Sequence, residues 1–200
     1  MKTKLLLILF CIGFVGIEAV SIAKPPTSNN VQEQINGIPV YRQSGSFIAP
    51  ETLDGLISTS DLVVIAKINQ SIEEAKSVPE VAADGTIGAP ISQVQGEIRQ
   101  VFKGNFFLKG QTITIGQQAA VLTAEDGKPY IRAIDDYQPF KKGRYLLFLK
   151  KGFDGQTYFP IGVYYGKYNI DGTDTSEDVI QDETFKNIRS AVRQRFKDSE

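Results

Sequence analysis

The sequence predicts a mainly β domain: a small antiparallel barrel of five to six strands, with a short helix before it and an amphipathic helix after it. Short segments rich in β-branched and aromatic residues follow one another, separated by Gly, Pro, Asn and Asp. The last stretch instead repeats its apolar residues at helical spacing. Because turns and not long crossover helices join the strands, the pattern favours an antiparallel sheet over a parallel α/β sheet.

Four segments carry the strand prediction. Residues 61–68 (DLVVIAKI) are rich in β-branched residues and predict a strand buried on nearly both faces. Residues 92–102 and 111–115 alternate polar and apolar positions, which indicates half-buried strands. Residues 144–149 (RYLLFL) are the most apolar run after the N-terminal segment. This run is too short for a typical helix, so a core strand is expected.

The remaining elements follow from turn residues and helical spacing. Residues 157–163 and 166–170 predict a hairpin whose turn lies near residues 164–166, while residues 117–139 are expected to form a loop. A short helix is predicted at about 50–58, where Pro50 suits the first turn. The final helix, at about 182–197, has apolar residues at helical spacing: Phe185, Ile188, Val192 and Phe196.

The N-terminus predicts export from the cytoplasm. Lys2 and Lys4 precede an apolar stretch from Leu5 to Ile17, and small residues follow at two candidate cleavage sites, after Ser21 or after Ala23. An uncleaved anchor is the alternative, but the apolar stretch is shorter than the roughly 20 residues that span a bilayer. We therefore expect a signal peptide at 1–23, a flexible leader at 24–45 and one barrel domain with its C-terminal helix at 46–200.

Missing residue types exclude most nucleophilic enzyme chemistry. The chain has no histidine, and its one cysteine, Cys11, lies inside the predicted signal peptide. The mature chain then lacks disulfides, Ser-His-Asp or Cys-His pairs, and imidazole or thiolate ligands for zinc. Lipidation of Cys11 is disfavoured because the bulky Phe10 precedes it. We predict a non-enzyme with no catalytic residues, no metal and no cofactor.

The charge balance gives little attraction to polyanions. Removal of residues 1–23 leaves 20 basic and 22 acidic residues, a net charge of about −2. We expect no nucleic-acid partner, and no stable membrane insertion after cleavage because no later segment is long and apolar enough. The predicted localisation is extracytoplasmic: extracellular, on the cell surface or in the periplasm.

The order of several motifs resembles a group of uncharacterised exported bacterial proteins. The motifs are SDLVVIAKI, VFKG, LKGQTITI, FKKGRYLLFL and GKYNIDG, spread over residues 50–172. The resemblance implies a small closed barrel similar to the OB-fold, with an architecture comparable to the barrel of the tissue inhibitors of metalloproteinases. That inhibitor family chelates its target's metal through a cysteine at the mature N-terminus, which this chain lacks, so the inhibitor activity does not carry over.

Two acidic groups are the candidates for carboxylate chemistry. Residues 171–178 hold four carboxylates, but their spacing does not match a calcium loop, so a solvated loop is expected. Asp135 and Asp136 lie with Glu125 and Asp126 in the segment before the core strand. If such carboxylates converged, the chain could act as a carboxylate-dependent hydrolase on a cell-envelope or glycan substrate, which is the alternative function.

Two further clusters could recognise a partner. The last helix carries Lys186, Arg189, Arg193, Arg195 and Lys197, but intervening acids favour an ordinary charged outer face over a membrane or groove binder. The tyrosines around the predicted hairpin are the expected binding residues: Tyr158, Tyr164, Tyr165 and Tyr168. In an extended strand Tyr164 and Tyr165 point to opposite faces, so at least one is expected at the surface. The leading hypothesis is an exported, non-catalytic protein that binds a protein or a saccharide polymer.

Overall fold

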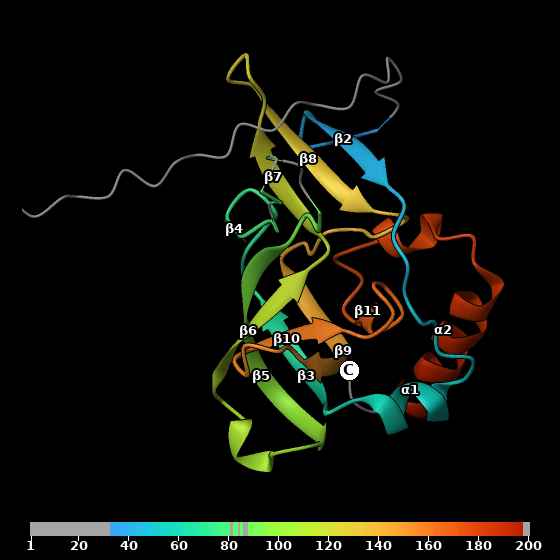
Figure 1. Ribbon diagram of the computed structural model, residues 1–200. Helices are drawn as coiled ribbons and strands as arrows, with labels where there is room; N and C mark the ends of the chain where they lie inside the picture. Colours follow the sequence, from blue (N-terminus) through green and yellow to red (C-terminus); the bar gives the residue numbers. More distant parts are fainter. Residues whose placement is uncertain (1–32, 81, 84, 86–87, 198–200) are drawn as a thin grey trace, which may run out of the picture.

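The computed structural model describes residues 33–80, 82–83, 85 and 88–197 (Figure 1). The predicted signal peptide and cleavage sites lie outside the described residues. The strands are β1 (Gln34–Ile35), β2 (Ile38–Gln43), β3 (Leu62–Ile68), β4 (Lys76–Ser77), β5 (Ser92–Lys103), β6 (Thr112–Gln117), β7 (Ala119–Thr123), β8 (Pro129–Ile134), β9 (Gly143–Lys151), β10 (Thr157–Pro160) and β11 (Lys167–Asn169). The helices are α1 (Leu53–Thr59) and α2 (Glu183–Arg195), with 3-10 turns η1 (Phe106–Leu108) and η2 (Ser176–Val179).

Five strands close into a barrel. β3, β5, β6, β10 and β9 pair in this order, and β9 returns to β3. Four of these pairings are antiparallel, but β10 runs parallel to β6, with Thr157 opposite Thr114. A ring with an odd number of strands cannot alternate direction at every pairing. The predicted small barrel is confirmed, and the prediction that it is antiparallel throughout is wrong at this one pairing.

β3 separates two apolar cores, which explains why both of its faces are buried, as predicted. Leu62, Val64 and further alternate residues fill the barrel interior. Val63 and Ile65 point outward into a second core, shared with α1, α2 and β8. Alternation along β9 is the same, with Leu147 inside and Phe148 outside. The barrel wall is therefore packed on both sides wherever the helices cover it.

The predicted hairpin between residues 157–163 and 166–170 is wrong. β10 and β11 run in the same direction along one edge of β9. Between them, residues 161–166 leave the edge of β9 and return to it at the same residue, Phe148. The Ile161 amide donates to the Phe148 carbonyl, and the Phe148 amide donates to the Gly166 carbonyl. At Gly166 a Cβ would overlap the Phe148 carbonyl oxygen and the Ile161 nitrogen. This position therefore requires glycine, and the excursion replaces the expected turn.

Residues 117–139, expected to be a loop, contribute two strands to a second sheet of order β1-β2-β8-β7. β7 and β8 form a hairpin around Asp126 and Gly127, and Gly127 has the positive φ of 80° that such turns favour. β2 pairs in parallel with β8, with Val40 opposite Ile131. Residues 34–43, placed by the sequence pattern in a flexible leader, thus belong to a sheet, and the ordered fold begins before residue 46.

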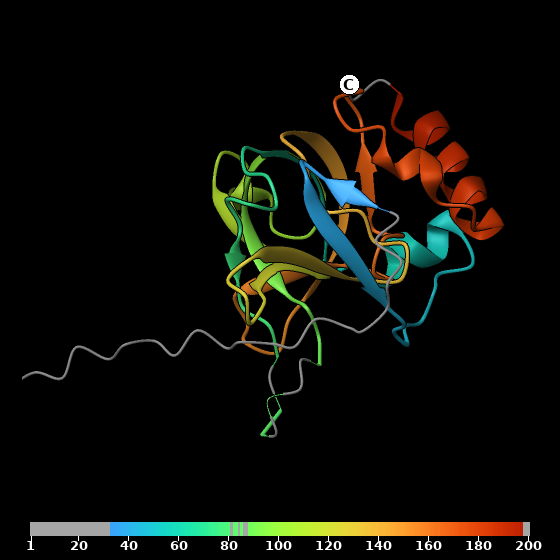
Figure 2. The same cartoon turned by 90° about the horizontal axis from the view of Figure 1, so that it is seen from above.

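The two helices lie side by side on one flank of the barrel (Figures 1 and 2). α2 confirms the predicted C-terminal helix: Asp182 caps it by accepting from the Phe185 amide, and Phe185 and Ile188 are buried. α1 begins after Thr52, whose side chain accepts from the Gly55 amide, three residues later than the start predicted at residue 50. The ion pair between Arg195 and Asp54 joins the helices at 2.6 Å.

Candidate functional site

The acidic loop after β11 is folded against the barrel, not simply solvated as the sequence suggested. Asp171 accepts from the Arg144 amide at 2.8 Å and from the side chains of Asn169 and Thr173. Further along, Asp174 and Glu177 are 3 % and 2 % exposed. The hydrogen bonds of Asp171 thus hold the loop against the barrel, and two of the loop's carboxylates lie in the interior.

Lys167 is the positive charge that these buried carboxylates face. Its side chain is 2 % exposed, and Nζ donates to the Gln138 carbonyl at 2.8 Å and lies 3.6 Å from Asp174 Oδ2. The ammonium also lies over three aromatic rings, those of Tyr137, Phe140 and Tyr145, at 5.7, 5.0 and 5.3 Å from their centroids. Burial lowers the pKa of Lys167, and the carboxylates of Glu177 and Asp174 partly oppose that shift.

The pKa values of Asp174 and Glu177 shift in opposite directions, although the two residues are close in the chain. Burial opposes ionisation of Asp174, but Lys167 and hydrogen bonds from Ser176 and Tyr145 outweigh it, so its pKa is lowered. Burial raises the pKa of Glu177 to about 7, despite Lys167, the Asn169 amide and Arg189. Glu177 Oε1 accepts from the Asn169 amide at 2.8 Å, whereas Oε2 has no hydrogen-bond partner among the described residues. The cluster thus pairs an ionised carboxylate with a carboxyl group that titrates near neutral pH.

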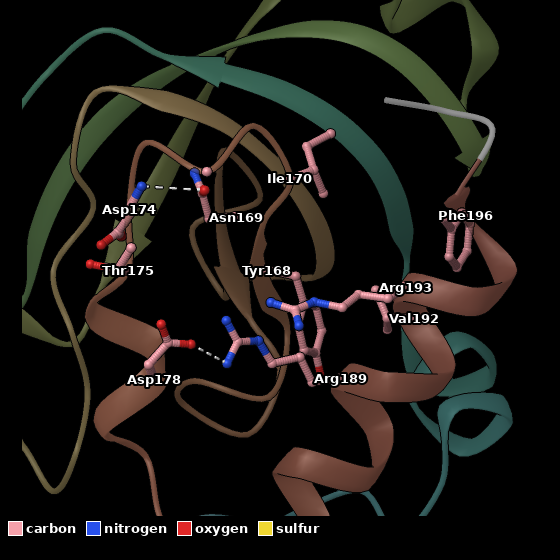
Figure 3. A pocket seen from close by; sticks show the side chains of 11 residues that line it. Tyr168, Asn169, Ile170, Asp174, Thr175, Asp178, Arg189, Val192, Arg193 and Phe196 are labelled. Carbon is pink, nitrogen blue, oxygen red and sulfur yellow. Dashed lines mark hydrogen bonds and ion pairs between the residues drawn. The ribbon is translucent and has the colours of Figure 1, made fainter.

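A pocket of about 300 Å³ opens beside this cluster, between α2, β11 and the acidic loop (Figure 3). Apolar side chains of Ile170, Val192 and Phe196 form part of its wall. Polar groups from the loop line another part, including Asp174, Thr175 and Asp178. The site is therefore built by the end of β11, the loop that follows it and the helix α2.

Two guanidinium groups reach into the pocket from α2 (Figure 3). Arg189 Nη1 pairs with Asp178 Oδ1 at 2.7 Å, and its Nε lies 3.8 Å from Glu177 Oε2. Arg193 has no hydrogen bond or ion pair to any described residue. Tyr168, 2 % exposed, also lines the pocket, and no described residue hydrogen-bonds its hydroxyl. The Arg193 guanidinium and the Tyr168 hydroxyl are therefore hydrogen-bond donors at this pocket that no described residue uses.

The tyrosines expected to bind a partner lie mostly in the core. Tyr164, Tyr165 and Tyr168 are 8 %, 2 % and 2 % exposed, and Tyr158 is half-buried beside the barrel core. Tyr164 and Tyr165 stack at 4.9 Å, and both rings pack edge-on against Phe185 of α2. The expectation that one of this adjacent pair is exposed is wrong, because the chain forms consecutive turns here and not an extended strand. Of the four, Tyr168 alone lines the pocket.

The two acidic groups do not come together. Asp135 accepts from the Gly45 amide at 3.2 Å, and its carbonyl accepts from Arg42. Asp136 is exposed. No hydrogen bond or ion pair within the described part of the chain joins either to the acids of residues 171–178. Among these same residues there is no group of three or more His, Cys, Asp or Glu side chains placed to hold a metal ion.

Sequence reasoning missed Lys167 and assigned Arg189 and Arg193 to an ordinary outer face. One signal was available: Lys167 interrupts an apolar, aromatic stretch that ends in the acidic loop. The pattern could not say which acids would reach it. It also passed over three exposed aromatic side chains, Phe106, Phe107 and Phe153.

Comparisons with known proteins give no family for this chain. No protein-family model matches the chain, and no curated protein matches it significantly. A search for membrane-spanning segments finds none of sufficient length and apolarity among the helices of the described residues.

Proposed function

We propose that this chain is an exported, non-catalytic binding protein, and that its pocket beside α2 binds a carboxylate-bearing ligand with an apolar body. One observation carries the proposal: Arg193 points into the pocket with no acidic partner among the described residues, next to Arg189 and the unpaired hydroxyl of Tyr168. Guanidinium groups bind carboxylates through paired, charge-assisted hydrogen bonds.

The charge of the pocket supports an anionic ligand. Two cationic side chains line it, whereas its acids are already engaged: Asp174 by Lys167 and Tyr145, and Asp178 by Arg189. Two adjacent guanidinium groups with one exposed carboxylate leave a net positive charge. An incoming carboxylate would relieve the repulsion between the arginines and provide an acceptor for Arg193.

The size and lining of the pocket support a small or terminal group. About 300 Å³ is at the lower end for ligand pockets, which suits a small acid or the last residue of a peptide. Ile170, Val192 and Phe196 offer an apolar wall for its side chain. A peptide with a free C-terminal carboxylate would fit the expected protein partner outside the cytoplasm.

The barrel connectivity supports the same class of function. We propose that the barrel is OB-like, since its strands taken in chain order pair as first-second-third-fifth-fourth and back to the first, with the third and fifth parallel. OB-folds are commonly binding modules, including for saccharide polymers. A fold alone does not determine a ligand, so the side chains of the pocket define the ligand class.

The experiment measures binding by calorimetry to three probes: a short peptide ending in an apolar residue with a free carboxylate, the same peptide as its C-terminal amide, and free phenylacetate. We expect the peptide acid or phenylacetate to bind and the amide to bind at least about tenfold more weakly. Binding of the peptide acid alone identifies a chain terminus, and binding of phenylacetate alone identifies a free small acid.

Two variants on the same helix test the residues. Arg193→Gln should weaken binding by about tenfold or more, because it removes a charge-assisted donor. Arg195→Gln is the matched control, since Arg195 pairs with Asp54 away from the pocket and should leave the affinity unchanged. Equal affinities of the acid and the amide, or equal losses in both variants, would contradict the proposal.

A carboxylate-dependent hydrolase is the second candidate, and one observation favours it. Asp174 and Glu177 have pKa values shifted apart, the pattern that acid and base pairs use. A hydrolase would release soluble fragments from peptidoglycan or a glycan, and Glu177→Gln would abolish the release. Release that persists in Glu177→Gln and in Asp135→Asn/Asp136→Asn would rule out both acidic groups.

A further inference from the structure

Three phenylalanine side chains project from the surface of the barrel. Phe106, Phe107 and Phe153 are 66 %, 90 % and 114 % exposed. No other aromatic residue is among the exposed large hydrophobic residues that the structure describes. Single exposed apolar residues are ordinary, but three large rings on neighbouring loops leave an apolar area that soluble proteins usually cover.

The loops that carry these rings are well-formed turns. In η1 the Asn105 side chain caps the turn by accepting from the Phe107 amide at 3.0 Å. In the β9–β10 turn Asp154 accepts from the amides of Gln156 and Thr157 and from the Thr157 hydroxyl. These hydrogen bonds fix the backbone on both sides of the exposed rings. Their exposure is therefore built into the local structure.

Both loops lie at the same end of the barrel, and Asp61 contacts the chain just before each of them. The Asp61 carboxylate accepts from Lys150 Nζ at 2.7 Å and from the Lys151 amide at 2.9 Å, just before Phe153. Its carbonyl lies against Gly104, just before η1. The pairing registers agree, since Lys103 of β5 and Leu149 of β9 flank the start of β3 on either side. Figure 1 shows η1, drawn in lime green, at the end of the barrel away from β2, β7 and β8.

Lysines lie next to the rings in the chain. Lys109 follows η1 and has no acidic partner among the described residues. Lys151 precedes Phe153 and lies near Asp154, whose pKa it helps to lower; both lysines are exposed. Lys103 donates to the carbonyls of Ile57 and Ser58, and its charge also helps to lower the pKa of Asp61. Acids at this end are already engaged, Asp61 by Lys150 and Asp154 by its own turn. The lysines next to the rings therefore outnumber these two acids, and this end of the barrel carries an excess of positive charge.

We infer that this barrel end is a peripheral docking surface for an anionic lipid bilayer, a function independent of the ligand proposed for the pocket. Phenylalanine rings partition into the boundary between headgroups and acyl chains, and lysines a few residues behind them reach lipid phosphates. Protruding single rings suit a fluid surface, which closes around each ring, whereas a protein partner would need a matching hole for each one. The binding is reversible and superficial.

The test is co-sedimentation of the full chain with vesicles that contain phosphatidylglycerol, compared with vesicles of phosphatidylcholine alone. The wild-type protein should bind the anionic vesicles, and Phe106→Ser/Phe107→Ser/Phe153→Ser should lower the apparent affinity by more than about tenfold. Val179→Ser is the matched control, because Val179 is 58 % exposed on η2 at another site. All proteins share the same residues 1–23, so any contribution from that segment cancels.

A second variant tests the charge. Lys109→Glu/Lys151→Glu should lower binding to the anionic vesicles several-fold, and the preference for them over phosphatidylcholine should fall with it. Equal sedimentation of the wild-type and triple-phenylalanine proteins would overturn the inference. So would self-association in solution that the phenylalanine variant abolishes, combined with no vesicle binding, since the occupant would then be a second copy of this chain.

Discussion

Near one end of β9 the protein buries charged side chains, and near the other end it exposes apolar ones. Beside α2 the protein buries Lys167, Asp174 and Glu177 together with tyrosines. At the β9–β10 turn it leaves Phe153 fully in solvent, and Phe106 and Phe107 are exposed in the turn after β5. Buried charge costs free energy unless it is paired, and exposed apolar area costs free energy unless something covers it. These two departures from the usual arrangement lie beside the pocket and at the docking surface that we propose.

The largest expected effect concerns the buried end. Asp174→Ala leaves Lys167 buried without its closest ionic partner, and we expect a loss of about 3–5 kcal/mol in the free energy of unfolding. Urea denaturation at neutral pH measures it. Asp178→Asn is the control, because its partly exposed pair with Arg189 should contribute less than about 1 kcal/mol. Similar losses in the two variants would mean that the buried pair has no special weight.

The pH dependence of stability gives the next effect. The pKa of Glu177 is about 7 in the folded protein against 4.5 as the ordinary value, so the folded state binds this proton more tightly. The associated stability is fully present below about pH 4.5 and is lost as the pH rises through about 7, by about 3 kcal/mol. The groups around Glu177 that act on it are Lys167, Asp174 and Arg189.

Glu177→Gln is the variant that isolates this contribution. Its unfolding free energy should lack the decline between about pH 4.5 and 7, while it keeps the loss at lower pH that the lowered pKa of Asp174 predicts. Urea denaturation across this pH range measures both proteins. A wild-type decline that survives in the variant would assign it to another group.

The smallest effect is expected at the exposed end. Phe106→Ser/Phe107→Ser/Phe153→Ser should change the free energy of unfolding by no more than about 0.5 kcal/mol, because the rings make little contact with the folded chain. Thermal unfolding checks this in the same preparations used for vesicle binding. A large destabilisation would mean that the rings support the barrel, and the contrast between the two ends would disappear.

The sequence was informative where a segment's neighbours along the chain decide its structure. The alternating or β-branched runs at β3, β5, β6 and β9 are strands, and the helical spacing and acidic cap of α2 describe a real helix. Only a short turn separates β7 from β8, and its Asp126-Gly127 signal was present but was outweighed by the mixed composition around it. Local pattern thus accounts for most of the barrel wall.

The failures lie where distant segments meet. Tyr164 and Tyr165 look like surface residues until residues 161–166 leave the edge of β9 and turn both rings toward Phe185. Lys167 looks like an ordinary strand lysine until the acidic loop folds back and Asp174 reaches it. No spacing rule predicts either contact, because each depends on how the chain returns to β9.

The amino-acid pattern was sufficient to predict that this protein is mainly β, that a helix follows the barrel, and that histidine takes no part in its chemistry. Composition and local periodicity are sufficient for these statements, since they need no knowledge of distant contacts. The three-dimensional fold was needed to show which charges are buried, which aromatic rings are exposed, and that Arg189 and Arg193 line one pocket. Burial and pairing depend on the closure of the barrel and the docking of α2, which bring together residues from β9, β11, the acidic loop and the helix.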